Sequence, residues 1–194
     1  MSSGSSKMNT PAHWPPGISY LSSPSYTLSV PPHILTEIRG SKPSLHTPPC
    51  NLVSIRRITA PNHPAAGQYG LFANRTIPPH SHICDYLGEV HCDDRNSDYD
   101  LSLLRTRDGT NVGVDANRKG NEARFVNDYR SIQAKPNAIF KEGRTTSGEL
   151  RISIWSGASK LRKGEEILVS YGKSWWKARH ADVSEEATQS RTPE

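Results

Sequence analysis

Residues 164–172 read Gly164-Glu165-Glu166-Ile167-Leu168-Val169-Ser170-Tyr171-Gly172. After the turn signal Lys163-Gly164, the pattern has a period of two, which places Ile167, Val169 and Tyr171 on one face. This alternation predicts a short β-strand that ends at Gly172, just before Trp175-Trp176. A tyrosine at the end of a strand is ordinarily a half-buried aromatic residue. Beside a glycine and two tryptophans, it is also well placed to point into a cleft.

The composition indicates one folded domain with less ordered appendages. The length of 194 residues fits a single domain, whereas 34% hydrophobic content and a mean hydropathy of −0.67 are low for a chain folded throughout. We expect residues 1–50 to be a Pro/Ser-rich arm, largely extended or disordered, that Trp14 or Tyr20 attaches to the domain. The folded domain is expected over residues 51–176, with a charged tail over residues 177–194.

Cysteine use and hydropathy exclude several classes of protein. Cys50, Cys84 and Cys92 form no CxxC pair, so neither a disulfide framework nor a zinc site is predicted, and no metal is expected. No apolar run approaches the ~18 residues of a membrane helix, and the N-terminus has no signal-peptide pattern, so we expect neither secretion nor a membrane partner. A net charge of +5 permits contact with nucleic acid without requiring it.

Short strands account for most of the central region. Apolar alternation and β-branched residues predict strands near residues 51–59, 69–73, 81–90 (interrupted at Gly88), 111–115, 137–141 and 150–155. We expect residues 93–104 to be a helical or irregular insert, and residues 117–129 to hold a turn or two of helix. Frequent turn signals and little helix predict a mostly β domain with short helices.

Five segments resemble, in chain order, the motifs of the SET-domain lysine methyltransferase family. They are GQYGLFA at 67–73, DYLGEV at 85–90, VDANRKGNEARFVN at 114–127, the pair Pro136-Asn137, and GEEILVSYG at 164–172. Each motif alone is weak, but chance is a poor explanation for all five in the same order. The resemblance implies a SET-domain-like β-clip fold of small sheets, with a C-terminal pseudoknot that joins the Asn127 loop to the Tyr171 strand.

The resemblance also implies an activity and a set of site residues. The donor would be S-adenosyl-L-methionine, with the substrate lysine entering a narrow channel from the opposite side. Tyr171 matches the catalytic tyrosine. The cofactor-binding positions would be Gln68, Tyr69, Asn127, Asp128, Tyr171 and Trp176, and the substrate-binding positions Tyr99, Val169 and Tyr171.

Bland alternatives exist for several of these residues. Taken alone, Gln68-Tyr69 could be a β-turn without a ligand, and Asn127 could be an ordinary turn residue. Arg124 and Glu166 could pair beneath the site and hold two threaded segments together, or form a solvated surface pair.

The chemistry of methyl transfer fits these residue types. A sulfonium donor and a neutral amine must be aligned, a lysine of pKa ~10.4 must lose its proton, and water must be kept out. None of this needs a metal or a covalent nucleophile. A tyrosine hydroxyl suits the reacting centre because it can donate and accept hydrogen bonds and support the developing charge.

The sequence also departs from the family. The usual N-H-S-C becomes Asn127-Asp128-Tyr129-Arg130, where an acidic side chain could weaken cofactor binding or mark a divergent branch. A plant branch of histone H3 monomethyltransferases in the family also lacks that histidine. The zinc-binding pre-SET and post-SET segments are missing, so Trp175, Trp176, the N-terminal arm or a second subunit in a homodimer would have to close the channel.

Local charge indicates the partner. Between positions 85 and 100, acidic residues outnumber a single arginine, Arg95. If this segment borders the channel, it would attract a basic protein substrate such as a histone tail, which implies a nuclear location. The alternative is an acidic solvated loop. A weak contact with nucleosomal DNA could use Arg118, Lys119, Arg124, Arg130, Lys135, Lys141 and Arg144. A second hypothesis is a catalytically weak or inactive SET fold that serves as a chromatin-interaction module. A third, a nucleic-acid-binding protein, rests on net charge alone.

Overall fold

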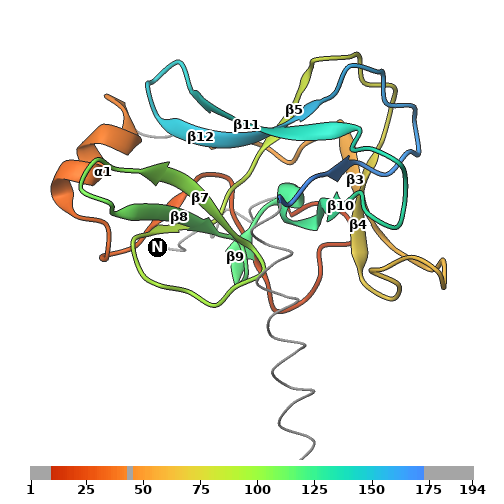
Figure 1. The fold of residues 1–194 in the computed structure, drawn as a ribbon, viewed down its shortest axis with the longest axis horizontal. Coiled ribbons are helices and arrows are strands. Elements are labelled where there is room, and N and C mark those ends of the chain that lie inside the picture. The colour runs from red at the N-terminus through yellow and green to blue at the C-terminus, as the bar shows by residue number, and fades with distance from the viewer. Residues whose placement is uncertain (1–9, 43–45, 173–194) are drawn as a thin grey trace, which may run out of the picture.

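Five small β-sheets of two to four strands meet near the centre of the computed structural model, which describes residues 10–42 and 46–172 (Figure 1). One sheet has the order β11 (Ala138–Arg144), β12 (Leu150–Ser156), β5 (His82–Asp85). The largest has the order β2 (Ser25–Tyr26), β6 (Glu89–His91), β8 (Asn111–Asp115), β7 (Asp100–Arg105). The strand pairs are β3 (Val53–Arg57) with β4 (Tyr69–Ala73), β1 (Ser19–Tyr20) with β9 (Lys119–Gly120), and β10 (Asn127–Asp128) with β13 (Leu168–Val169).

The mostly β fold class is confirmed, and the strands lie where apolar alternation is strongest. In β8, Val112 and Val114 are buried, and the bounds of β4 and β8 match the prediction. The predicted strand over residues 81–90 is interrupted and forms β5 and β6. Gly88 lies in the interruption, where a Cβ atom would come within 2.5 Å of the Asp115 carbonyl oxygen. The helical signal before residue 129 corresponds to the 3-10 helix η1 (Glu122–Phe125).

The insert over residues 93–104 differs from the prediction. Its second half forms β7, which pairs antiparallel with β8, with Asp100 opposite Asp115 and Leu101 opposite Val114. The acidic residues that precede it (Asp93, Asp94 and Asp98) hide this strand from propensity arguments, and pairing with the buried β8 orders it.

The N-terminal arm also differs from the prediction of a largely extended or disordered segment. Helix α1 (Pro32–Arg39) begins at a proline and buries Ile34 and Ile38 in the main core. The indole of Trp14 lies edge-on to the rings of Tyr20 and Phe125, so the predicted attachment of the arm through Trp14 and Tyr20 is confirmed. The arm is therefore part of the folded unit.

The C-terminal segment 166–169 lies between two segments that are distant in sequence. Glu166 forms an antiparallel bridge with Phe72 of β4, and β13 pairs in parallel with β10. The side-chain amide of Asn137 donates to the Glu166 carbonyl and accepts from the Leu168 N–H, both at 2.8 Å. Because the segment has partners on both sides, Leu168 is buried as well as Val169. This is the threaded arrangement expected from a pseudoknot.

The predicted closing tryptophans, Trp175 and Trp176, and the charged tail lie outside the described residues. Within residues 10–42 and 46–172, no helix is long and apolar enough to span a membrane.

The packing of α1 can be tested by truncating one of its buried side chains. Replacing the fully buried Ile38 with alanine should lower the free energy of unfolding by about 2–4 kcal/mol, because the lost methyl groups leave a cavity. The matched control is Leu28→Ala, since Leu28 lies in the same arm but is fully exposed and should change stability by less than about 0.5 kcal/mol. Urea denaturation measures both values. An Ile38→Ala protein as stable as wild type would show that the arm does not unfold with the rest of the domain.

Candidate active site

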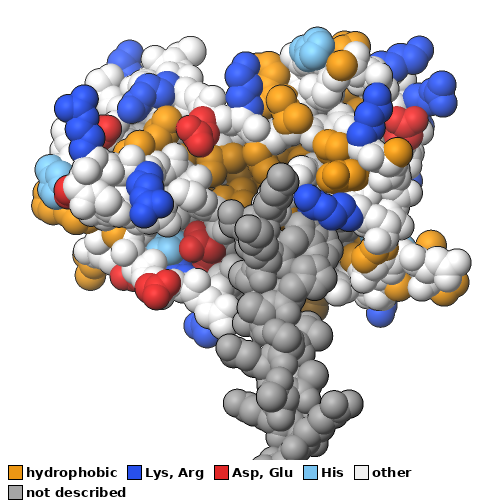
Figure 2. All heavy atoms as spheres, in the orientation of Figure 1, with side chains coloured by type: hydrophobic (Ala, Val, Ile, Leu, Met, Phe, Trp, Pro, Cys, Tyr) orange, Lys and Arg blue, Asp and Glu red, His pale blue; other side chains and the backbone are white. Residues whose placement is uncertain are grey.

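A cavity of about 600 Å³ opens where the sheets meet. Figure 2 shows hydrophobic side chains gathered in the central hollow, with Lys and Arg distributed around its rim. The N-terminal arm supplies Pro15 and Ile18 to the wall. Aromatic residues form much of the remaining lining: Tyr69, Tyr86, Tyr99, Phe125, Phe140 and Tyr171. The cavity can therefore enclose an apolar chain and keep water away from it.

Tyr171 enters this cavity directly after the threaded segment. Its hydroxyl donates to the Val126 carbonyl at 2.8 Å, and its backbone N–H donates to Asp128 Oδ2 at 2.8 Å. Burial, assisted by the negative charges of Asp128 and Glu166, raises the pKa of the Tyr171 phenol well above its usual value. The side chain is therefore a neutral hydrogen-bonding group at neutral pH and not a phenolate base.

Asn127 lies on the cavity wall, and its hydrogen bonds fix the orientation of its amide. Nδ2 donates to Glu166 Oε1 at 2.9 Å and to the Tyr69 carbonyl at 3.3 Å. Both N–H groups are then occupied by acceptors. In the part of the chain that the structure describes, no donor is paired with Asn127 Oδ1, so this oxygen can accept from a ligand.

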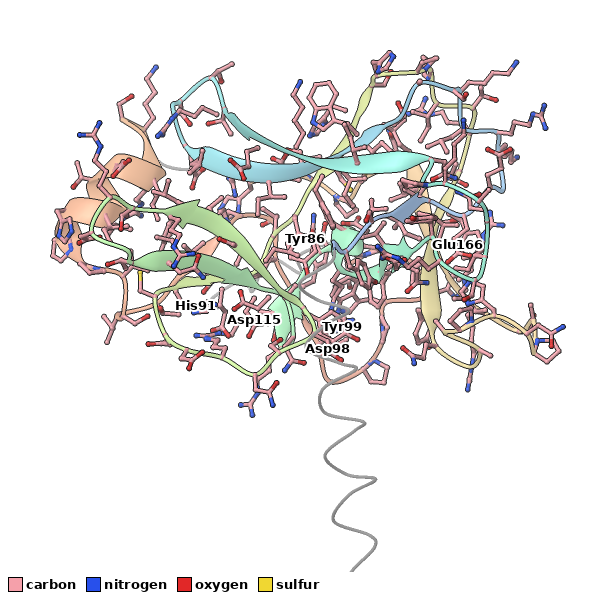
Figure 3. The ribbon with its side chains drawn as sticks, viewed as in Figure 1. Tyr86, His91, Asp98, Tyr99, Asp115 and Glu166 are labelled. Atoms are coloured by element: carbon pink, nitrogen blue, oxygen red, sulfur yellow. The ribbon has the colours of Figure 1, made fainter. Side chains whose placement is uncertain are left out.

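Tyr99 and Tyr86 also line the cavity, and both lie to the left of Glu166 in the view of Figure 3. The Tyr99 carbonyl accepts from the Ala116 N–H at 3.0 Å and from the Tyr86 hydroxyl at 2.8 Å. The Arg124 guanidinium lies 4.1 Å from the centre of the Tyr99 ring. Burial raises the pKa of Tyr86 well above its usual value, although the charge of Arg124 opposes the shift. The two hydrogen bonds to the Tyr99 carbonyl and the stacked Arg124 guanidinium thus hold the Tyr99 ring in place.

A buried carboxylate anchors the loop that carries Tyr99. Asp115 accepts from the Ser97 hydroxyl at 2.8 Å and from Arg95 Nη1 at 3.1 Å, and its own backbone lies in β8. The aspartate of the Val114-Asp115-Ala116 motif therefore has a structural purpose, because it fastens the acidic insert to the sheet next to the cavity.

Comparison with known proteins agrees with this geometry. The SET domain family matches residues 68–172, which is more than half of the chain. The chain belongs to the SET-domain family. The cavity and the threaded segment lie within or beside the matched region.

Three curated relatives carry the same domain. The chain is 29% identical over 112 residues to histone-lysine N-methyltransferase EHMT1 of Homo sapiens. This match covers 56% of this chain and 8% of that protein. It is 35% identical over 114 residues to histone-lysine N-methyltransferase Set2 of Drosophila melanogaster, which covers 53% of this chain and 4% of that protein. It is 34% identical over 112 residues to histone-lysine N-methyltransferase set-2 of Caenorhabditis elegans, and the match covers 53% of this chain and 7% of that protein. The chain thus spans less than a tenth of each relative.

A solved structure shares the fold. The crystal structure of ATXR5 in complex with mono-methylated histone H3.1 superposes with a TM-score of 0.59 at 15% sequence identity, and the match covers 81% of this chain and 82% of that chain. At this identity, the likeness concerns the fold alone.

The structure brings most of the predicted SET site residues together. Gln68, Tyr69, Asn127, Asp128, Tyr99 and Tyr171 all line the cavity. Val169 does not, because it pairs opposite Asp128 in the threaded segment and is fully buried there. The substrate contact of Val169 therefore stays a prediction, and the structure gives Val169 a place in the core beside the cavity. Trp176 lies outside the described residues.

The predicted Arg124–Glu166 ion pair is also wrong. Arg124 donates to the Ala116 carbonyl at 2.8 Å and stacks on Tyr99. Glu166 instead accepts from Asn127 and is hydrogen-bonded to His63, with 3.0 Å between His63 Nε2 and Glu166 Oε2.

Asp128, the main departure from the SET motif, is paired within the protein. Its Oδ2 lies 2.8 Å from Arg130 Nη1, and its Oδ1 accepts from the Arg130 N–H. The same carboxylate accepts from the Tyr171 backbone N–H. The substitution therefore does not place an unpaired negative charge in the cavity.

The charged segments contribute less to the site than their composition indicated. Of the acidic residues between positions 85 and 100, Asp98 lines the cavity, whereas Asp85 pairs with His82 and Asp100 pairs with His91. In the basic set proposed for DNA, Arg124 is buried and Lys119 pairs with Glu89. Across residues 10–42 and 46–172, no group of three or more His, Cys, Asp or Glu residues could hold a metal ion.

Several lining residues were not predicted from the sequence. Tyr86 stands inside the DYLGEV motif, so its position was visible although its role was not. Phe140, Leu101 and His63 line the cavity without a local signal, since tertiary contacts alone bring their segments to it.

The raised pKa of Tyr171 predicts its titration behaviour. Because the folded-state pKa lies above the unfolded value of about 10, the stability that Tyr171 contributes is fully present below pH 10 and is lost as the pH rises through the folded pKa. Wild-type protein and Tyr171→Phe should therefore show the same phenolate absorbance up to about pH 11. Above pH 10, the unfolding free energy of Tyr171→Phe should fall less steeply. If wild-type protein showed a phenolate signal below about pH 11 that Tyr171→Phe lacks, the buried environment assigned to Tyr171 would be contradicted.

Proposed function

We propose that this protein transfers a methyl group from S-adenosyl-L-methionine to a lysine side chain of a basic protein segment, most simply a histone tail. The observation that carries the proposal is that the Tyr171 hydroxyl, the Asn127 amide and an aromatic wall line one cavity. The relatives named as histone-lysine N-methyltransferases support the reaction class.

The residues present fit the donor. Asn127 Oδ1 is an acceptor with its amide already oriented, which suits the ammonium group of an amino acid. Gln68 and Tyr69 lie next to it on the same wall. The donor supplies a methyl group on a positively charged sulfur, and the aromatic faces of Tyr69 and Phe125 suit such a cation.

The opposite part of the cavity fits a lysine side chain. Tyr86, Tyr99 and Phe140 present aromatic surface to the four methylene groups and to the cationic head of the chain. Loss of the amine proton precedes transfer, because the nitrogen lone pair forms the new bond to carbon while the carbon–sulfur bond breaks. Since Tyr171 stays protonated, we assign it the alignment of the amine and not its deprotonation.

The substrate class rests on charge and on the names of relatives. Asp98 gives the cavity a carboxylate beside Tyr99, where a basic residue next to the target lysine could pair with it. The ATXR5 structure contains a histone H3.1 ligand, and a histone substrate here would place the protein in the nucleus.

The second candidate function is an inactive chromatin-interaction module. It is motivated by Asp128, which replaces the histidine of the SET motif. The ion pair of Asp128 with Arg130 favours the enzyme, because the carboxylate is compensated within the protein and does not add an unpaired charge to the donor site. Binding of a basic peptide without any affinity for the donor would favour the module.

The catalytic role is tested by removing one hydroxyl. Tyr171→Phe should lower methyl transfer to a histone peptide mixture by about 100-fold or more, because the amine loses its aligning group. Affinity for S-adenosylhomocysteine, measured by calorimetry, should change by less than about threefold. The matched control is Tyr129→Phe, which removes a hydroxyl from a neighbouring tyrosine outside the cavity lining. Full activity of Tyr171→Phe would refute the assignment.

The role of Asp98 is tested by neutralising it. Asp98→Asn should raise KM for a basic peptide by about three- to tenfold with little change in kcat, because it weakens attraction without altering the reacting groups. Asp108→Asn is the control, since Asp108 is exposed in a turn away from the cavity. Equal KM values for Asp98→Asn and Asp108→Asn would remove Asp98 from the substrate site.

A further inference from the structure

A continuous chain of hydrogen bonds runs along one wall of the cavity. His63 Nε2 lies 3.0 Å from Glu166 Oε2, and Glu166 Oε1 accepts from Asn127 Nδ2 at 2.9 Å. The side chains of His63 and Glu166 are only 10% and 11% exposed. The three residues come from the loop before β4, the threaded segment and β10, so the chain joins three separate parts of the fold. Figure 3 shows Glu166 among these elements.

The direction of each hydrogen bond follows from the groups at its ends. His63 Nδ1 accepts from the Ala65 N–H at 3.0 Å, so the ring proton is on Nε2 and is donated to Glu166. A neutral imidazole satisfies both of these contacts. Glu166 is then a carboxylate with one oxygen held by His63 and the other held by Asn127.

This arrangement determines which end of the Asn127 amide faces the ligand. With Nδ2 committed to Glu166 and to the Tyr69 carbonyl, Oδ1 presents an acceptor. If the Glu166 carboxylate turned away or took up a proton, the amide could rotate and present its N–H groups instead. An ammonium group would then meet donors and not an acceptor.

We propose that His63 is a positioning residue that acts through Glu166 to hold Asn127 in the orientation that accepts the ammonium group of the donor. His63 lies before the region matched by the SET domain family, residues 68–172. The inference rests on the proposed function, since it concerns the same donor. His63 would thus affect the binding only of ligands that carry the ammonium group, without itself contacting the reacting atoms.

Close packing supports this role for Glu166. A Cβ atom at Gly70 would lie 2.7 Å from Glu166 Oε1, so the glycine leaves the space that the carboxylate occupies. The carboxylate thus has little freedom to choose a partner other than His63 and Asn127.

The experiment compares two ligands that differ at the amino-acid end. S-adenosylhomocysteine carries the ammonium group, whereas methylthioadenosine lacks the whole amino-acid part. Calorimetric titrations of the full chain use wild type, His63→Leu, which removes the donor, and His63→Gln, which restores an N–H donor. His33→Leu is the matched control, because His33 is exposed on α1.

We expect His63→Leu to weaken S-adenosylhomocysteine by about tenfold and to leave methylthioadenosine within about twofold of wild type. His63→Gln should recover most of the lost affinity, and His33→Leu should match wild type for both ligands. Equal weakening of both ligands by His63→Leu would overturn the positioning role, because a general structural effect does not depend on the ammonium group. Unchanged affinity for both would overturn it as well. A folded wild-type protein that binds neither ligand would overturn the proposed function itself.

Discussion

The pairing of the threaded segment with β10 is the constraint on which the site depends. Residues 127–128 and 168–169 are 41 residues apart in the chain yet pair in parallel, and this pairing places Asn127 and Tyr171 at one cavity. Two-residue strands have little stability alone. Asn137 extends the ladder, since its side-chain amide replaces a backbone partner for Glu166 and Leu168. The Pro136-Asn137 pair of the family pattern therefore has a physical explanation: it fastens the threaded segment from its second side.

Once this segment is in place, one side chain connects its position to ligand recognition. Glu166 lies between β4 and β10, where Gly70 leaves room for it and where Asn127 and His63 donate to it. A carboxylate that is nearly buried requires such donors. The same bonds that satisfy Glu166 orient the Asn127 amide, so a requirement of stability also arranges an acceptor in the cavity. Tyr171 follows directly after the paired segment, and burial of its hydroxyl raises the pKa and keeps the group neutral.

Local patterns in the sequence predicted the parts of the fold whose burial is regular. Strands β4, β8 and β12 show apolar residues at alternate positions, and the family motifs placed Tyr69, Asn127 and Tyr171 at one site. Strand β7 was missed because acidic residues precede it in the insert and because its order depends on pairing with β8, while its one acidic residue, Asp100, pairs with His91. Ile34, Leu35 and Ile38 hint at one turn of helix, but the proline-rich neighbours favour an extended arm, and the burial of Ile34 and Ile38 depends on a distant core. His63 and Phe140 carry no local signal, since only the folded chain brings them to the cavity.

The departure at Asp128 shows how one substitution can change the connections of a site without emptying it. The resemblance assigned this position to the cofactor, where a negative charge would be unfavourable. In the fold, the carboxylate turns to Arg130 and to the backbone N–H of Tyr171. It therefore supports the segment that carries Tyr171, and its charge is compensated by Arg130, two residues later in the chain. Under the proposed function, donor recognition would then rest on Asn127 and on the cavity walls, and the hydrogen-bonded chain from His63 would hold the Asn127 amide in the orientation that this recognition needs.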